Sequence, residues 1–227
     1  MPLYPCPLCR GNIADLFFND AQREYFRCRT CHLVFVPAAY YLVPAEERAM
    51  YDLHRNHPAD EGYRHFLNRL FQPLNQTLAP QSKGLDFGCG PGPVLALMFK
   101  EAGHRMAAYD PYYAPDASVL ADDYDFITAS EVLEHLHKPG EVLPRLFSSF
   151  RPGGILGVMT GLVRDRAAFS TWHYIRDPTH VCFFSRETFE WLADKWVTQV
   201  IFISDRVVLF KKPHRRSKTM VTQGGKN

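Results

Sequence analysis

Residues 83–102 constrain the fold most, because they combine a strand, a glycine-rich loop and a helix in direct succession. Residues 83–87 are apolar enough for a buried strand, and residues 93–102 have helical spacing, with Pro93 suited to the first turn. Three glycines lie between them: Gly88, Gly90 and Gly92. Glycine lets a backbone approach a ligand closely, and a ligand here would meet the N–H groups that begin the helix. The segment therefore predicts an α/β fold with a binding site at the loop.

Two acidic residues indicate which cofactor the loop serves. The glycines form GxGxG preceded by Asp86, whereas a dinucleotide fingerprint is GxGxxG. Residues 104–110 are expected to form a second strand that ends in Asp110, where a carboxylate can bind two ribose hydroxyls. Further elements are expected as a strand at 125–130, a helix at 141–150 and a strand at 155–160.

Four motifs together resemble the class I S-adenosylmethionine-dependent methyltransferases in order and spacing: D-F-G-C-G-P-G, Y-D-P, Y-D-F-I-T-A-S-E-V-L-E-H-L and L-F-S-S-F-R-P-G-G-I-L. The resemblance covers residues 80–212. It implies a Rossmann-like, doubly wound, seven-stranded sheet with the last strand antiparallel, and residues 197–212 fit the closing hairpin. The same resemblance implies these cofactor contacts: Asp86, Gly88, Cys89, Gly90, Gly92, Asp110, Pro111 and Ser130. Residues 111–124 can hold little more than a short strand, where the usual pattern fits a helix, a third strand and a loop, which leaves the binding of adenine open.

The stretch S-E-V-L-E-H-L puts Glu131, Glu134 and His135 at positions i, i+3 and i+4. In a helix these groups share one face. That face can be a metal site, part of a substrate pocket, or the solvated side of an amphipathic helix. The resemblance places the stretch at the carboxyl edge of the sheet, beside the transferred methyl group, which favours a functional role over a solvated face.

A long aromatic loop, residues 161–185, follows the strand at 155–160 and ends in D-P-T-H-V-C-F-F-S. Loops at the carboxyl ends of parallel strands form ligand sites. The D-P-T-H element resembles a subset of these methyltransferases in which the histidine faces the methyl group, so His180 is the candidate base for a hydroxyl acceptor. The alternative is a histidine that only orders the loop, together with Asp177. The candidate catalytic residues are His180, Glu131, Glu134 and His135.

The same residues also resemble a metal site. E-x-x-E-H with a later histidine is similar to the divalent-metal site of some O-methyltransferases, including ubiquinone-pathway enzymes and small-RNA 2′-O-methyltransferases. Carried over, the ligands would be Glu131, Glu134, His135 and His180, a set that suits Mg²⁺, Mn²⁺, Fe²⁺ or Zn²⁺. A metal-free substrate pocket and a purely structural helix remain the alternatives.

Four cysteines near the start of the chain form a CxxC-x18-CxxC pattern: Cys6, Cys9, Cys28 and Cys31. Two such knuckles can hold one structural Zn²⁺ tetrahedrally, which predicts a zinc ribbon over residues 1–40 with two short strands between the knuckles. Disulfides and a redox CxxC are the alternatives, and a reducing compartment disfavours the disulfides. Residues 41–80 are expected to be a helical linker or lid, with the methyltransferase domain at 81–212.

The net charge of +2 hides an acidic body, since residues 1–210 carry 20 Lys and Arg against 24 Asp and Glu. The basic excess belongs to the end of the chain, where residues 213–227 are expected to be a disordered tail. Neither a secretory signal nor a transmembrane run is evident, so a cytoplasmic protein that does not bind membranes is expected.

Three functions are compatible with these observations. The first is an S-adenosylmethionine-dependent methyltransferase that acts on an oxygen of a small molecule. The second is a methyltransferase of RNA or protein whose ribbon docks the macromolecule, although the acidic body disfavours nucleic acid. The third is a non-catalytic binding module on the same scaffold. The sequence does not indicate an oligomeric state.

Overall fold

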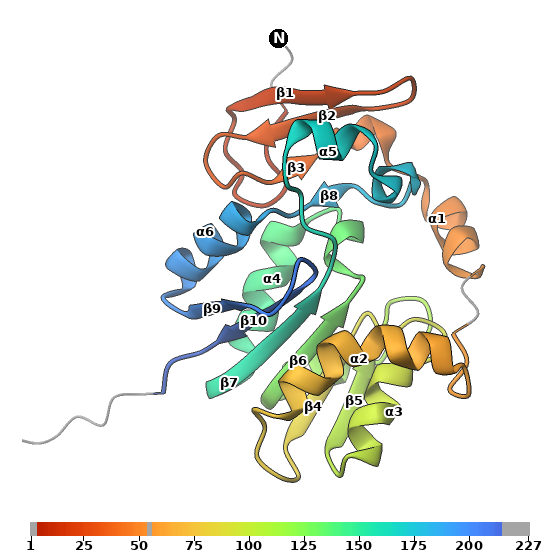
Figure 1. Ribbon diagram of the computed structural model, residues 1–227, viewed down its shortest axis with the longest axis vertical. Helices are drawn as coiled ribbons and strands as arrows, with labels where there is room; N and C mark the ends of the chain where they lie inside the picture. Colours follow the sequence, from red (N-terminus) through yellow and green to blue (C-terminus); the bar gives the residue numbers. More distant parts are fainter. Residues whose placement is uncertain (1–3, 54–55, 215–227) are drawn as a thin grey trace, which may run out of the picture.

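The computed structural model describes residues 4–53 and 56–214, which form two sheets with helices around the larger one (Figure 1). The larger sheet has the strand order β5-β4-β6-β7-β10-β9. Its strands are β4 (Lys83–Phe87), β5 (Arg105–Tyr109), β6 (Tyr124–Ser130), β7 (Phe150–Met159), β9 (Gln199–Phe202) and β10 (Val207–Lys211).

Four strands of this sheet are parallel, and β10 runs antiparallel to both of its neighbours, β7 and β9. The doubly wound α/β fold with a closing hairpin is therefore confirmed. The expected number of seven strands is wrong, because the sheet has six among the described residues. Residues 111–124 are too short for another crossover, and they hold a bridge between Asp110 and Ala114 and a 3-10 helix, η2 (Ala117–Ala121).

Helices cover both faces of the larger sheet. On one face, α2 (Glu61–Asn75) and α3 (Val94–Glu101) pack on alternate residues of β6, β7 and β10, and α2 buries Leu67, Leu70 and Leu74. On the opposite face lie α4 (Pro139–Ser148) and α6 (Arg186–Trp196). The shorter helices are α1 (Pro44–Tyr51), α5 (Arg166–Ser170), η1 (Ala38–Tyr40), η3 (Leu133–His135) and η4 (His173–Arg176).

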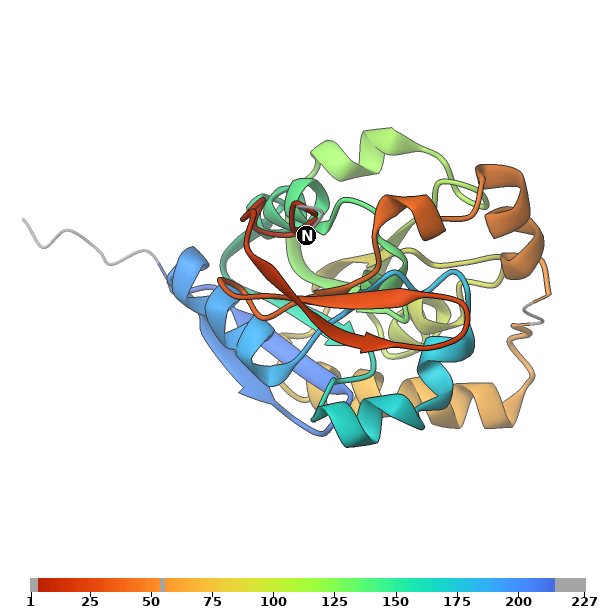
Figure 2. The ribbon, with the colours of Figure 1, turned by 90° about the horizontal axis from the view of Figure 1, so that it is seen from above.

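The smaller sheet joins the N-terminal segment to the rest of the chain. Its order is β1-β2-β3-β8, with β1 (Ala14–Asn19), β2 (Glu24–Cys28), β3 (Val34–Phe35) and β8 (Cys182–Phe183). Strand β8 belongs to the aromatic loop after β7, so the three strands of the N-terminal segment are completed by a strand from the part of the chain that carries the larger sheet. Figure 2 shows the β1–β2 hairpin lying across the molecule above that loop.

The far end of the chain is only partly described. Of the expected basic tail at 213–227, residues 215–227 lie outside the described residues. Among the residues that are described, no helix is both long and apolar enough to cross a membrane.

Candidate active site

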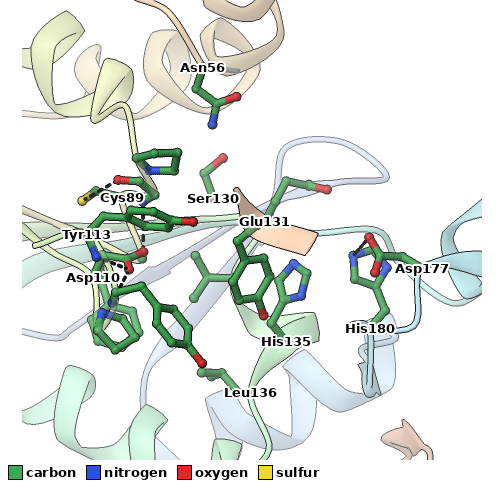
Figure 3. A pocket seen from close by; sticks show the side chains of 18 of the residues that line it. Asn56, Cys89, Asp110, Tyr113, Ser130, Glu131, His135, Leu136, Asp177 and His180 are labelled. Atoms are coloured by element: carbon green, nitrogen blue, oxygen red, sulfur yellow. Dashed lines mark hydrogen bonds and ion pairs between the residues drawn. The ribbon is translucent and has the colours of Figure 1, made fainter. Parts of the chain in front are cut away.

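A cavity of about 940 Å³ lies where the parallel strands β4, β5 and β6 end. The residues that follow these strands, Gly88, Asp110 and Glu131, all line it. Figure 3 shows Asp110 and Cys89 at one end of the cavity and Asp177 and His180 at the other. The cavity thus spans both regions that the sequence singled out. The predicted residues that line it are Gly88, Cys89, Gly90, Asp110, Pro111, Ser130, Glu131, His135 and His180.

The glycine loop depends on the absence of side chains at two positions. Gly88 and Gly90 have φ angles of 72° and 64°, in the left-handed region that favours glycine. A Cβ at Gly88 would also lie 2.5 Å from a methyl group of Val132. The Gly90 N–H donates to Asp110 Oδ2 over 3.0 Å. This hydrogen bond fixes the glycine loop relative to the acidic residue that follows β5.

Asp110 is buried and organises its own loop as well. Its Oδ1 accepts hydrogen bonds from the N–H groups of Tyr112 (2.8 Å) and Tyr113 (3.1 Å). Glu47 of α1 contacts the same region, since it accepts a hydrogen bond from the Tyr112 hydroxyl over 3.2 Å. The Tyr113 hydroxyl donates a hydrogen bond to Asp52 Oδ1 over 2.6 Å. Helix α1 therefore fixes the tyrosines that cover this end of the cavity.

Two predicted cofactor residues do not line the cavity. Asp86 is buried beneath the glycine loop, where it accepts a hydrogen bond from the Thr128 hydroxyl over 2.8 Å. Burial raises the pKa of Asp86 to about 6. A Cβ at Gly92 would lie 2.1 Å from the carbonyl oxygen of Asn56, so this glycine allows the segment before α2 to cross the loop. Asp86 and Gly92 therefore lie behind the residues that line the cavity and contribute to the position of the glycine loop.

The stretch from Ser130 to Leu136 is not an α-helix. Glu131 has a φ of 51°, and only Leu133–His135 form a short 3-10 turn, so the i, i+3, i+4 face does not exist. Glu131 and His135 line the cavity, whereas Glu134 is fully buried behind it. A positive φ in a residue with a side chain is costly, and strained residues of this kind cluster at active sites and ligand-binding segments.

The hydroxyl of Tyr174 joins the two carboxyl groups. It contacts Glu134 Oε1 in a short hydrogen bond and Glu131 Oε2 at 3.3 Å. A phenol has one proton to donate, so two ionised carboxylates cannot both be satisfied by it. Burial raises the pKa of both glutamates, and the charge of Glu134 raises that of Glu131 further. Burial therefore favours the protonated form of one carboxyl group of the pair, whereas Arg206, which lies 3.6 Å from Glu131 Oε1, favours the ionised form.

The backbone fixes the tautomer of His180. Its Nδ1 lies 2.7 Å from the carbonyl oxygen of Tyr174, and a carbonyl can only accept, so Nδ1 carries the hydrogen. The lone pair is then on Nε2, which lies 3.8 Å from Asp177 Oδ2. Burial, together with the nearby His135, lowers the pKa of His180 to about 4, so the imidazole is neutral at physiological pH. The cavity thus contains a histidine nitrogen that can accept a proton or a hydrogen bond.

Three of the four residues expected to bind a second metal come together. The ligand atoms of Glu134, His135 and His180 lie within 4.8 Å of one another, and Glu131 is not in this group. Glu134 is already engaged, since Oε2 accepts from the Thr160 hydroxyl over 2.9 Å and Oε1 from Tyr174. The complete four-ligand set is therefore not assembled.

The four N-terminal cysteines do assemble. All are free thiols, with Sγ atoms 3.5 Å apart for Cys6 and Cys31 and 3.4 Å apart for Cys9 and Cys28. A tetrahedral Zn²⁺ with bonds of about 2.3 Å needs sulfurs about 3.8 Å apart, so the cluster fits this ion with a small expansion.

The two CxxC knuckles share one backbone geometry. The residue after each second cysteine has a positive φ: Arg10 at 62° and His32 at 61°. In both knuckles, this residue donates its N–H to the carbonyl of the first cysteine. Backbone N–H groups also point at sulfur, from Gly11 to Cys9 and from Thr30 to Cys28, each over 3.4 Å. Such donors stabilise thiolates.

Comparisons with known proteins bear on the identity of the cavity. Residues 54–196 match a family model described as a methyltransferase domain. The chain belongs to this methyltransferase family. It is therefore an enzyme of the S-adenosylmethionine-dependent class that its motifs resemble, and the hypothesis of a non-catalytic module is not supported. A search of curated proteins finds no match.

Solved structures similar to this methyltransferase show low sequence identity. One is the 1,6-didemethyltoxoflavin-N1-methyltransferase of Burkholderia thailandensis, with 18% identity over 88% of this chain and 100% of that chain, and a TM-score of 0.49. Another is an O-methyltransferase family protein from the same organism, with 14% identity over 82% of this chain and 65% of that chain, and a TM-score of 0.48. A putative sarcosine dimethylglycine methyltransferase from Galdieria sulphuraria has 16% identity over 70% of this chain and 76% of that chain, with a TM-score of 0.49.

Two residues that line the cavity, and one that contacts the loop carrying His180, were not expected from the sequence. Arg206, in the turn between β9 and β10, reaches Glu131. Asn56 lines the cavity above the glycine loop. Arg23, in the N-terminal segment, contacts the loop that carries His180. None of them belongs to a motif, because each reaches the site from an element that is distant in sequence.

Replacing Tyr174 with Phe should destabilise the protein by about 1–3 kcal/mol, because it leaves buried carboxyl oxygens without a donor. Urea unfolding monitored by tryptophan fluorescence measures the difference. Tyr113→Phe is the matched control, because its hydroxyl bonds an exposed carboxylate and its loss should cost about 0.5 kcal/mol or less. Equal unfolding midpoints for Tyr174→Phe and wild type would contradict the bridging role.

Proposed function

We propose that the protein is an S-adenosylmethionine-dependent O-methyltransferase of a small molecule, with His180 as the group that receives the acceptor's proton. The fixed tautomer of His180 carries this proposal, because it leaves a lone pair on Nε2 of a histidine that lines the cavity. The acceptor would be a hydroxyl compound, since a hydroxyl must lose its proton to become a good nucleophile. A neutral amine has no such requirement.

The cofactor would lie at the end of the cavity formed by the glycine loop. Gly88, Cys89 and Gly90 offer backbone without bulky side chains, and Asp110 offers a buried carboxylate for ribose hydroxyls. When bound, S-adenosylmethionine supplies a methyl group already activated on a sulfonium. Pro111 and Ser130 would complete this end, with Tyr112 and Tyr113 beside the purine.

The acceptor would lie between the cofactor and His180. Here the chain contributes mainly position, because methyl transfer is an in-line displacement and alignment of the two reactants dominates its rate. Glu131, His135 and Asp177 line this end as well, and the protonated form of Glu131 can donate a hydrogen bond to an acceptor oxygen. The volume of about 940 Å³ is in the range of small-molecule sites, which favours a small acceptor over a macromolecule.

We propose further that one structural Zn²⁺ occupies the cysteine cluster and that the acceptor site works without a metal. The thiol geometry and the matched knuckles support the first statement. The second is supported by Glu134, both of whose oxygens already accept hydrogen bonds.

Asp110→Asn should weaken binding of S-adenosylhomocysteine about tenfold or more, because it removes a charged hydrogen-bond acceptor. Isothermal titration calorimetry measures the affinity. The control is Asp116→Asn, an exposed helix cap outside the cavity, which should change affinity less than about twofold. Undetectable binding by wild type at about 1 mM, or unchanged binding by Asp110→Asn, would refute the cofactor site.

Incubation of the enzyme with methyl-labelled cofactor and a cell extract should label the small-molecule fraction. His180→Gln should lower the rate about a hundredfold, since general-base catalysis contributes on this scale, and should leave S-adenosylhomocysteine binding unchanged. His65→Gln, on the exposed side of α2, is the control and should retain full activity. Label that enters only RNA or protein would contradict a small-molecule acceptor.

Purified protein should contain about one zinc ion per chain, lost in Cys9→Ser and retained in Cys89→Ser, because Cys89 is outside the cluster. Plasma emission spectrometry measures the metal content. Zinc-depleted protein should also unfold at lower urea, since the metal supplies folding energy to such modules. A second metal ion that disappears in Glu134→Ala would overturn the metal-free acceptor site.

A further inference from the structure

Arg23 lies in the cysteine-bearing segment, in the turn before β2, yet its side chain is buried in the loop that carries His180. Its guanidinium donates from Nη1 to the carbonyl oxygens of His180 (3.0 Å) and Pro178 (3.3 Å). Nη2 donates to the carbonyl of Asp177 over 3.1 Å and to that of Ile175 in a short bond.

The remaining donor of Arg23 stays within the N-terminal segment. Its Nε donates to the Tyr25 hydroxyl over 3.2 Å, and that hydroxyl donates to Asp20 Oδ2 over 2.9 Å. Asp20 Oδ1 in turn accepts from the Arg23 N–H over 2.7 Å. A guanidinium has five N–H donors in a fixed fork, so every donor of Arg23 has an acceptor. The turn before β2 therefore orients the Arg23 side chain toward the loop, where carbonyl oxygens accept its hydrogen bonds.

Four carbonyls that converge on one point repel each other and lose water when buried. Unpaired buried carbonyls cost free energy, and without Arg23 the carbonyls of Pro178 and His180 would lose their donor, whereas that of Asp177 would keep the His180 N–H. A single planar cation that donates to all four removes both problems. Lysine cannot replace it fully, because an ammonium offers three donors in a tetrahedral arrangement.

The segment held by Arg23 is the one that orients the site's histidines. The carbonyl of Tyr174 that fixes the His180 tautomer immediately precedes Ile175, whose carbonyl Arg23 binds. The His135 Nδ1 lies 3.3 Å from the carbonyl of Thr179, in the same segment.

On the other side of His180, the N-terminal segment contacts the loop again. The Val36 N–H donates to the Val181 carbonyl over 3.0 Å, and β3 pairs with β8 at Val34–Phe183 and Phe35–Cys182. The loop is thus held both before and after the histidine by elements of the N-terminal segment.

We propose that Arg23 is a positioning residue of the acceptor site, and that the cysteine-bearing segment is part of the active site because it holds the His180 loop in register. The inference rests on the proposed function for the role of His180. It assigns to the N-terminal segment a task within this chain, in place of docking a macromolecule.

Arg23→Met tests the proposal, with Arg29→Met as the matched control, because Arg29 lies in the same segment and pairs with Asp15 at the surface. Hydrogen exchange measured by mass spectrometry should show amides of residues 173–183 exchanging about tenfold faster or more in Arg23→Met, with other regions unchanged. In ¹⁵N-histidine spectra, the His180 ring should lose its single Nδ1–H tautomer. Arg29→Met should match wild type in both measurements.

A third variant and a binding measurement make the test decisive. Arg23→Lys retains charge and should give intermediate exchange in residues 173–183, which covers the case that Arg23→Met fails to fold. S-adenosylhomocysteine affinity should change less than about twofold in both Arg23 variants, because the glycine loop is not held by Arg23. An unchanged loop and tautomer, or faster exchange spread evenly over the chain, would overturn the positioning role. Failure of wild type to bind S-adenosylhomocysteine would instead refute the proposed function.

Discussion

The backbone pairing of β3 with β8 is the interaction on which the proposed site depends, because it joins the cysteine-bearing strands to the loop that carries His180. A loop of this length after β7 would otherwise have many conformations, and ordering it costs free energy for each residue. The pairing of β3 with β8 contributes backbone hydrogen bonds, and four N–H donors of Arg23 contribute side-chain hydrogen bonds to carbonyls of the loop, which together offset that cost. The Zn²⁺ that we propose for the cysteine cluster would in turn stabilise the N-terminal segment.

Much of the larger sheet could be predicted from the sequence, because its strands and helices follow local patterns. The strand at residues 83–87, the glycine loop and the helix after it lie where the spacing indicated. Asp110 and Glu131 line one cavity because parallel strands end at one edge. The shortness of residues 111–124 correctly indicated a departure from the usual methyltransferase pattern. It did not lead to the prediction that the sheet has six strands instead of seven.

The interior of the site could not be predicted, because it depends on contacts between distant residues. Helical spacing gave the wrong geometry for Ser130–Leu136, where tertiary contacts impose a positive φ at Glu131. Burial raises the pKa of Glu131 and Glu134, and this burial depends in part on Tyr174, which approaches from the aromatic loop. Nothing in the sequence around Arg23 indicates that its guanidinium crosses to carbonyls more than 150 residues away.

In the proposed function, one cavity holds the cofactor at the glycine loop and the acceptor at His180. A crystal structure of the complex with S-adenosylhomocysteine tests this arrangement most directly. We expect the ribose hydroxyls to contact Asp110 and the cofactor sulfur to face the part of the cavity lined by Glu131 and His180. A cofactor bound away from Asp110, or with its sulfur turned away from His180, would contradict it.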